Sequence, residues 1–156
     1  MLKLISRILH SKELCHSQLF DNQTFYKVFT KDLLCASRRV CIESPYITKR
    51  RIAELLPVLE RLREKDVAIT INTRCPDEHN GMYIQQAYDA VQSMQELGIK
   101  VLYTVKHHRK LAVIDDVLWE GSLNILSQND SCEIMRRIES KSLVNQMIAF
   151  AKLDKF

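Results

Sequence analysis

The hydrophobic pattern divides the first two thirds of the chain into alternating helices and strands. Apolar side chains recur at helical spacing over residues 25–34, 52–62 and 82–97, and short β-branched runs occupy residues 39–44, 67–73 and 99–105. Asp21 or Asn22 can cap the first helix and Thr48 can cap the second, while Gly98 is a natural stop for the third. Strands that alternate with helices through connections long enough for crossovers predict a parallel sheet covered by helices.

The pattern changes after residue 105. Two short strands over residues 110–115 and 117–120 are predicted to flank an Asp115-Asp116 turn, and residues 122–127 to start a helical turn. A last strand over residues 133–139 and a helix over residues 142–153 close the chain. We therefore expect an α/β fold in which a mixed, largely parallel sheet lies between α-helices.

The chain length predicts one domain over residues 1–156. Its core is expected over residues 20–156, preceded by an N-terminal amphipathic helix or arm over residues 1–19. Apolar positions in residues 2–12 are interrupted by Lys3 and Arg7, which favours an amphipathic helix over a signal peptide. No stretch approaches the ~18 apolar residues of a membrane span, so stable membrane insertion is not expected.

Composition excludes several classes of function. The three glycines are far apart, which excludes a Walker A loop and a glycine-rich dinucleotide loop. The five cysteines contain no C-x-x-C pair, so free thiols in a reducing cytoplasm are favoured over a disulfide scaffold or a zinc knuckle. The net charge of +4 favours an anionic partner only mildly.

Residues 106–110 are lysine, histidine or arginine throughout and hold the candidate chemistry. In a strand, His108 and Lys110 would point the same way and Arg109 the opposite way. Asp115 follows, and a Gly121-Ser122-x-Asn124 segment comes after the predicted turn. A base or nucleophile, a fixed cation and neutral hydrogen-bonding groups suit a phosphate. They do not suit zinc, which needs more ligands, or two-metal catalysis, which needs several carboxylates.

Written out, His108-x-Lys110-x4-Asp115 followed by Gly121-Ser122-x-Asn124 resembles the HKD signature of the phospholipase D superfamily. The resemblance covers roughly residues 20–150, and Glu133 lies shortly downstream as in the family. Short members with a single motif are the most similar in pattern, and they include metal-independent bacterial endonucleases. One departure is that five residues, 116–120, separate Asp115 from Gly121 where the family usually has six.

The resemblance implies a site that needs two copies of the motif. No other histidine here is followed by x-Lys, so two chains would build the site in a homodimer. His108 of one chain would attack phosphorus, and His108 of the other would protonate the leaving oxygen and then activate water. The remaining roles that the resemblance implies are phosphoryl binding by Lys110 and Asn124 assisted by Ser122, histidine orientation by Glu133, and motif orientation by Asp115. It implies no metal and no other cofactor.

We therefore predict a homodimeric, metal-independent, endonuclease-like phosphodiesterase that acts on DNA or RNA in the cytoplasm, alone or beside a helicase or restriction partner. One alternative is a phospholipid or cardiolipin hydrolase, and another is a weakly active nucleic-acid-binding module. Simpler readings stay open for three features: Asp115 as a turn former, residues 121–124 as a helix start, and Glu133 as a structural residue. The basic run 49–51, like Arg74, Arg136 and Arg137, is either a solvated surface or a guide for a polyanion.

Overall fold

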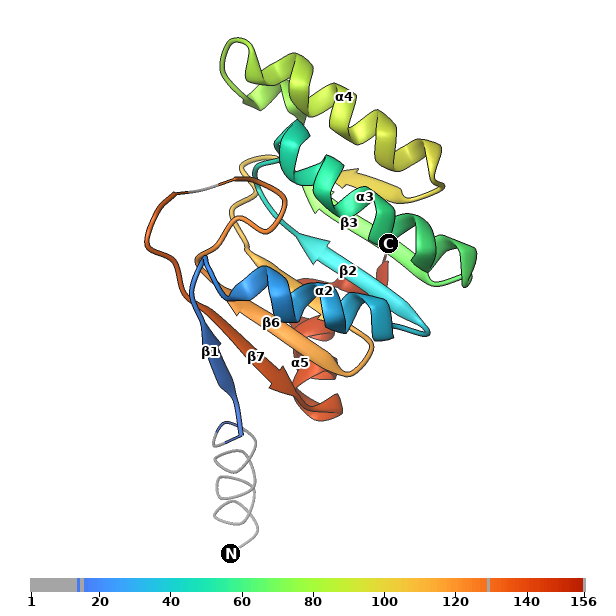
Figure 1. The fold of residues 1–156 in the computed structure, drawn as a ribbon, viewed down its shortest axis with the longest axis vertical. Coiled ribbons are helices and arrows are strands. Elements are labelled where there is room, and N and C mark those ends of the chain that lie inside the picture. The colour runs from blue at the N-terminus through green and yellow to red at the C-terminus, as the bar shows by residue number, and fades with distance from the viewer. Residues whose placement is uncertain (1–13, 15, 129, 156) are drawn as a thin grey trace, which may run out of the picture.

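The computed structural model describes residues 14, 16–128 and 130–155. Its four helices are α2 (Phe25–Cys35), α3 (Lys49–Glu64), α4 (Tyr83–Glu96) and α5 (Lys141–Ala151), with short 3₁₀ turns η1 (Pro76–Glu78) and η2 (Leu153–Lys155). The described strands are β1 (Gln18–Phe20), β2 (Arg39–Glu43), β3 (Ala68–Thr73), β4 (Lys100–Tyr103), β5 (Leu111–Ile114), β6 (Val117–Gly121) and β7 (Met135–Glu139). Figure 1 shows their arrangement along the chain.

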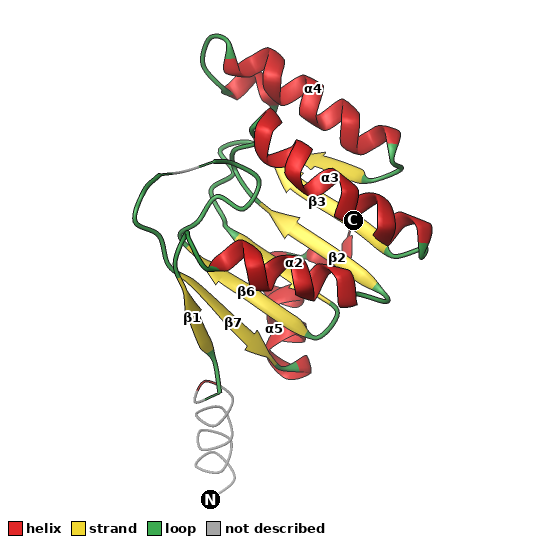
Figure 2. Ribbon diagram, in the orientation of Figure 1, coloured by secondary structure: helices red, strands yellow, loops and turns green. Residues whose placement is uncertain are grey.

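These strands form one mixed sheet in the order β1-β7-β6-β5-β2-β3-β4. The parallel part is β2, β3 and β4, and the other described strand pairs are antiparallel. Helices α2, α3 and α4 cover one face and α5 covers the other (Figure 2). The predicted fold class, helices that enclose a mixed sheet, is confirmed. Of the described strand pairs two are parallel and four antiparallel, so the sheet is less parallel than expected.

Local signals place most of the helix ends. Asp21 Oδ1 accepts hydrogen bonds from the amides of Gln23 and Thr24 just before α2 begins. Thr48 caps α3, because its hydroxyl accepts the Arg51 amide at 3.4 Å. Gly98 has a φ of +73°, the left-handed conformation that ends a helix at low cost, and it follows Leu97, the C-cap residue of α4. The sequence predicted the Thr48 cap and the Gly98 stop, but for α2 it predicted Asp21 or Asn22 as the cap, whereas the N-cap residue is Thr24 and Asp21 binds the turn before it.

The core lies on both faces of the sheet. Beneath α2, the buried rings of Phe25, Phe29 and Trp119 pack against one another, with ring centroids 4.8–6.0 Å apart. A smaller apolar cluster that includes Leu111, Val113 and Val144 lies beneath α5. In the described part of the chain, no helix has the length and apolar character needed to cross a bilayer.

Two segments differ from the sequence prediction. Strand β1 was not predicted, and it takes Gln18 and Leu19 out of the expected N-terminal arm by pairing them with β7. The amphipathic helix expected over residues 2–12 lies outside the described residues. Residues 122–127 contain one turn, in which the Ser127 amide donates to the Asn124 carbonyl, and do not continue as a helix.

The hairpin of β5 and β6 carries the predicted Asp115-Asp116 turn. Its register pairs Leu111 with Glu120, so the Gly121 amide donates to the Lys110 carbonyl at 3.3 Å. Gly121 has no room for a side chain, because a Cβ there would lie 2.1 Å from the Ile134 carbonyl oxygen. The close approach of β6 and β7 thus requires glycine at this position.

Candidate active site

The segment between β4 and β5 places the candidate catalytic residues. Because β4 lies at the sheet edge and β5 lies beside β2, residues 104–110 cross the carboxyl ends of β3 and β2. The carboxyl edge of parallel strands is the usual place for a ligand site in an α/β sheet. His108 and Lys110 end this crossing, immediately before β5 begins.

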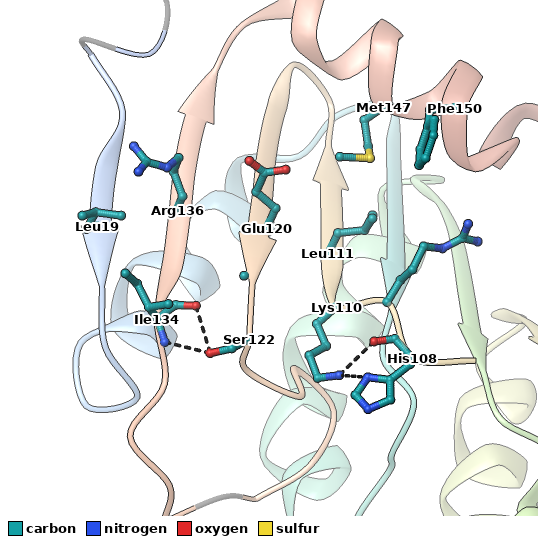
Figure 3. Close-up of a pocket in the computed structure, with 12 residues that line it drawn as sticks. Leu19, His108, Lys110, Leu111, Glu120, Ser122, Ile134, Arg136, Met147 and Phe150 are labelled. Carbon is teal, nitrogen blue, oxygen red and sulfur yellow. Dashed lines mark hydrogen bonds between the residues drawn. The ribbon is translucent and has the colours of Figure 1, made fainter. Parts of the chain in front are cut away.

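His108 and Lys110 lie side by side, as their spacing predicted. Lys110 Nζ is 2.5 Å from His108 Nδ1 and donates to the His108 carbonyl oxygen at 2.8 Å (Figure 3). Burial lowers the pKa of Lys110, and the positive charge of Arg74 lowers it further, whereas the negative charge of Glu133 raises it. The Lys110 ammonium therefore lies in a partly desolvated environment, where a cation can bind an anion more strongly than in water.

Arg109 turns toward a buried carboxylate. Its guanidinium Nε and Nη2 both donate to Glu43, which is 1% exposed at the end of β2, with Nη2 2.8 Å from Oε1. Asn72 donates to the same Oε1 at 3.0 Å, and Thr104 donates to Asn72 at 2.9 Å. This network fixes the residue between His108 and Lys110 in two directions and leaves those two side chains on the other side of the segment.

An open cleft of about 860 Å³ extends from the His108–Lys110 pair across the face of the sheet. Figure 3 shows its two parts. The polar end holds His108, Lys110 and Ser122, and an apolar wall is formed by Leu19, Ile134, Met147 and Phe150. The wall is made by β1, β7 and its preceding loop, and α5.

Ser122 lies in this cleft, but its hydroxyl is also part of the backbone pairing. Its Oγ accepts the Ile134 amide at 3.0 Å, and its own amide donates to the Ile134 carbonyl at 2.9 Å. Asn124 is half-buried two residues later and is not among the side chains that line the cleft. Its Oδ1 is buried and has no hydrogen-bond donor within the described residues.

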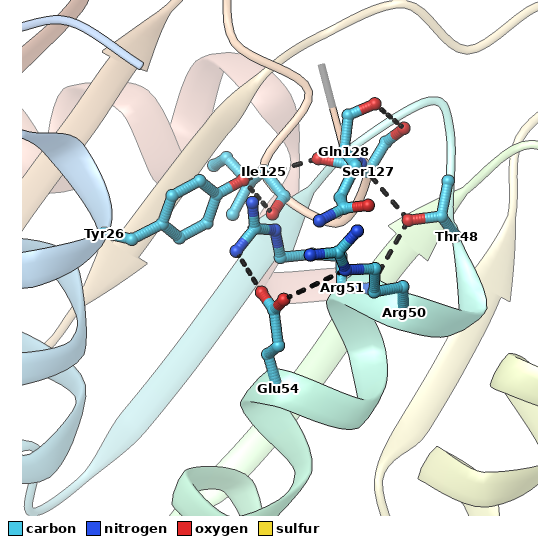
Figure 4. A network of polar contacts seen from close by, with 8 residues as sticks. All are labelled: Tyr26, Thr48, Arg50, Arg51, Glu54, Ile125, Ser127 and Gln128. Atoms are coloured by element: carbon cyan, nitrogen blue, oxygen red, sulfur yellow. Dashed lines mark hydrogen bonds and ion pairs between the residues drawn. The ribbon is translucent and has the colours of Figure 1, made fainter. Parts of the chain in front are cut away.

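The loop that carries Asn124 is held from two sides (Figure 4). Tyr26 of α2 donates its hydroxyl to the Ile125 carbonyl at 2.9 Å, and Thr48 Oγ1 accepts the Gln128 amide at 3.2 Å. Arg51 lies over the Tyr26 ring with its guanidinium carbon 3.6 Å from the centroid. These contacts give the loop a fixed path although it is neither helix nor strand.

Glu133 and Asp115 lie at different places. Glu133 accepts a hydrogen bond from Ser131 at 2.6 Å, and its charge acts on Lys110. Asp115 lies at the far end of β5, where its carboxylate accepts the backbone amides of residues 37, 38 and 39 at 2.8–3.0 Å. The structure thus brings His108, Lys110 and Ser122 into one cleft, and it places Asp115 where it holds the start of β2 against the turn.

Two residues near the pair were not assigned from the sequence. Glu43 was hidden within an apolar strand, although a charged residue at the end of a buried strand is a signal in itself. Arg74 was predicted to be either a solvated charge or a guide for a polyanion, with no place in the site, yet it follows β3 directly and therefore lies at the same edge of the sheet as His108. Within the described residues, no three His, Cys, Asp or Glu side chains gather as a metal site would require.

A family model described as "Cardiolipin synthase, PLD-like domain" matches residues 30–153. Because the match covers most of its length, the chain belongs to this phospholipase D-like family, which confirms the resemblance seen in the sequence. A search of curated proteins by sequence found no match.

Solved structures show the same fold. Nuc from Salmonella typhimurium, a phospholipase D family member, is 14% identical with a TM-score of 0.71 over 86% of this chain and 90% of that one. NucT from Helicobacter pylori is 18% identical with a TM-score of 0.64 over 87% and 92%. Phosphatidylserine synthase from Haemophilus influenzae is 12% identical with a TM-score of 0.72 over 87% of this chain and 36% of that one.

Asp115 and Asp116 offer a direct test of the turn. Burial would raise the pKa of Asp115, but the amides of Arg39, Ser37 and Arg38 outweigh it and hold the pKa below its usual value. We expect Asp115→Ala to lower the free energy of unfolding by about 3 kcal/mol, since several charge-assisted hydrogen bonds are lost. Asp116→Ala breaks only an exposed ion pair with Arg38 and should cost under about 1 kcal/mol. Equal losses in urea unfolding would contradict this role for Asp115.

His107 should make the protein less stable in mild acid. Burial lowers the pKa of this 4% exposed side chain, and the charges of Arg109, Lys110 and Arg74 lower it further, while Glu43 opposes them. The unfolded chain therefore binds more protons than the fold below the ordinary pKa of about 6.5, so stability falls as the pH falls through that value. For this group, the free energy of unfolding should fall by up to about 1.4 kcal/mol for each pH unit below that value.

The measurement is urea unfolding at about pH 7.5 and about pH 5.5. His107→Gln should flatten the dependence whatever its effect on stability at neutral pH. His16→Gln, at an exposed position, is the matched control and should leave the slope unchanged. A wild-type slope that persists in His107→Gln would contradict the assignment.

Proposed function

We propose that this protein is a metal-independent phosphodiesterase that cleaves nucleic acid through a phosphohistidine intermediate in a homodimer. The observation that carries the proposal is the His108–Lys110 pair, held at the carboxyl edge of the sheet and opening into a cleft. Membership in the phospholipase D-like family supports phosphodiester chemistry at this pair. An imidazole beside a fixed ammonium suits nucleophilic attack on a phosphorus whose oxygens the cation holds.

The contact between the pair suggests how substrate binding activates the histidine. When Lys110 donates to His108 Nδ1, that nitrogen is an acceptor and the ring proton lies on Nε2. Attack by Nε2 needs the opposite tautomer. A phosphodiester that draws Lys110 Nζ onto its non-bridging oxygens frees Nδ1 for the proton. Glu133, whose charge already acts on Lys110, is the carboxylate that would accept a hydrogen bond from Nδ1.

The proposed reaction has two displacements. His108 Nε2 forms a bond to phosphorus while the bond to the leaving oxygen breaks, and that oxygen takes a proton from the partner's His108. A water molecule then attacks phosphorus, gives its proton to the partner's His108, and the phosphorus–nitrogen bond breaks. Lys110 from both chains would balance the charge on the phosphoryl oxygens, and the side-chain amide nitrogen of Asn124 would donate a hydrogen bond to one of them.

The surface around the pair favours a second copy of the chain. The motif occurs once, so one chain supplies one imidazole of this kind. Three large apolar side chains in the cleft wall are well exposed: Leu19 by 56%, Ile134 by 53% and Phe150 by 78%. An exposed apolar surface this close to a reactive pair is typical of an interface. A two-fold axis beside the pair would cover this wall and bring both histidines to one phosphorus.

The same wall favours one alternative, a phospholipid hydrolase. Acyl chains could occupy the apolar part of the cleft while the headgroup phosphate reaches Lys110. We favour nucleic acid because the net charge is +4 and because Arg74 and Arg136 add positive charge around the pair. A nucleic-acid-binding module with little turnover is the other alternative.

Cleavage in excess EDTA tests the chemistry. Single- and double-stranded DNA and RNA should be cut with the chelator present, and His108→Ala should lower the rate by about a thousandfold or more. His16→Ala, an exposed histidine away from the cleft, is the control and should keep full activity. Loss of wild-type cleavage on adding EDTA would contradict the mechanism. Hydrolysis of cardiolipin vesicles alone would favour the lipid alternative, and binding without cleavage would favour the module.

Mixing variants tests the shared site. If both imidazoles act on one phosphorus, a dimer with one His108→Ala chain is inactive. After subunit exchange, activity should therefore fall as the square of the wild-type fraction, with solution mass measured in parallel to confirm the dimer. A linear fall, or a monomeric mass with full activity, would show that each chain acts alone.

A further inference from the structure

Arg74 is fixed against the catalytic segment. It is half-buried directly after β3, and its Nε donates to the His107 carbonyl oxygen at 2.6 Å. His107 precedes His108, so the guanidinium is attached to the backbone that carries the reactive imidazole. Its positive charge contributes to lowering the pKa of both Lys110 and His107.

A tyrosine ring holds the same guanidinium from a second direction. The Arg74 guanidinium carbon lies 5.2 Å from the centroid of the Tyr46 ring, in the loop after β2. His79 meets that ring edge-on, with centroids 5.6 Å apart and an angle of 75° between the planes. Burial lowers the pKa of His79, and Arg74 lowers it further, while Glu78 raises it. Arg74 is thus preorganised, and little side-chain freedom would be lost on binding a ligand.

The charge of Arg74 is not paired with a carboxylate, which is also true of Arg39, Arg61, Arg63 and Arg136 among the described residues, but Arg74 is the one whose charge acts on Lys110. Arg38, Arg51, Arg109 and Arg137 each form an ion pair with a carboxylate. Within the part of the chain that the structure describes, Arg74 is in no ion pair, and its terminal nitrogens have no hydrogen-bond partner. A partly buried guanidinium whose terminal nitrogens have no hydrogen-bond acceptor among the described residues is suited to an anionic ligand.

We propose that Arg74 and Tyr46 form a subsite for the phosphate and base next to the scissile phosphodiester of a nucleic acid strand. The inference rests on the proposed function and extends it to the neighbouring nucleotide. Two donors of the guanidinium fork would bind the second phosphate, and the tyrosine ring would offer a face to a base. Only a strand supplies both groups, whereas a simple phosphodiester supplies neither. The subsite would therefore select a polymer over a small substrate.

A comparison of two substrates tests the subsite. Arg74→Gln keeps an amide that can donate to the His107 carbonyl but removes the charge. We expect its KM for a single-stranded oligonucleotide to rise about tenfold or more, as for the loss of a charge-assisted contact. Its kcat/KM for bis(4-nitrophenyl) phosphate, which has one phosphate, should fall by a clearly smaller factor than its kcat/KM for the oligonucleotide. The log–log salt dependence of oligonucleotide binding should become shallower by about 0.7.

Two further variants separate the subsite from general effects. Arg61→Gln removes an exposed charge in the last turn of α3 and should leave both substrates unaffected. Tyr46→Leu should raise the KM for the oligonucleotide alone, because the aromatic ring on which a base would stack is lost. Equal losses of kcat/KM on both substrates in Arg74→Gln would mean that Arg74 only supports the fold of residues 104–110. An unchanged KM for the oligonucleotide and an unchanged salt dependence would mean that Arg74 binds no phosphate. Either result overturns the subsite.

Failure of the subsite and failure of the proposed function give different results. If the wild-type protein cleaves neither substrate, the proposed phosphodiesterase is wrong, and anisotropy of a fluorescent oligonucleotide still compares wild type with Arg74→Gln. Weaker binding with the shallower salt dependence would support the subsite in a binding protein. No binding by the wild type would overturn both.

Discussion

The ion pair between Arg109 and Glu43 connects the reactive segment to the sheet. Glu43 ends β2 and is almost fully buried, so its charge depends on the two guanidinium donors and on Asn72. Removing Arg109, whose side chain is itself 42% exposed, should cost about 1–3 kcal/mol, because the Glu43 carboxylate would then be buried without its guanidinium donors. With Arg109 fixed, the extended backbone has no freedom to rotate, and His108 and Lys110 must lie together on the opposite side. The geometry of the reactive pair thus follows from the residue between its members.

The hairpin of β5 and β6 positions Ser122 relative to Lys110. Asp115 holds the start of β2 at one end, and the β5–β6 register then fixes Gly121 beside Lys110 at the other. Because the turn has only two residues, the register cannot slip without turning every side chain of β6 to the other face. The five-residue spacing between Asp115 and Gly121 is therefore accommodated by a tight turn, and Ser122 still reaches the cleft.

Most of the fold could be predicted because its elements repeat at helical or strand periods over many residues. The contact between His108 and Lys110 could also be predicted, since a spacing of two is sufficient to place two side chains together in an extended segment. Strand β1 could not, because three partly exposed residues carry no periodic signal. The path of the loop after Ser122 depends on Tyr26 and Thr48, which are distant in sequence, and local patterns do not report such contacts. Arg74 was visible as a charge but not as an unpaired one.

The charges of the site explain why a phosphate would change it rather than simply fill it. Burial lowers the pKa of Lys110 and repulsion from the charge of Arg74 adds to this, and the nearest hydrogen-bond acceptor for Lys110 is the imidazole of His108. A bound anionic phosphoryl group would relieve this repulsion. It would also compete with the imidazole for the hydrogen bonds that the Lys110 ammonium donates. In the proposed mechanism, substrate binding would therefore also release His108 Nδ1 from its hydrogen bond with Lys110. An imidazole kept by its own lysine in the less reactive tautomer until a phosphate arrives would be protected from other electrophiles.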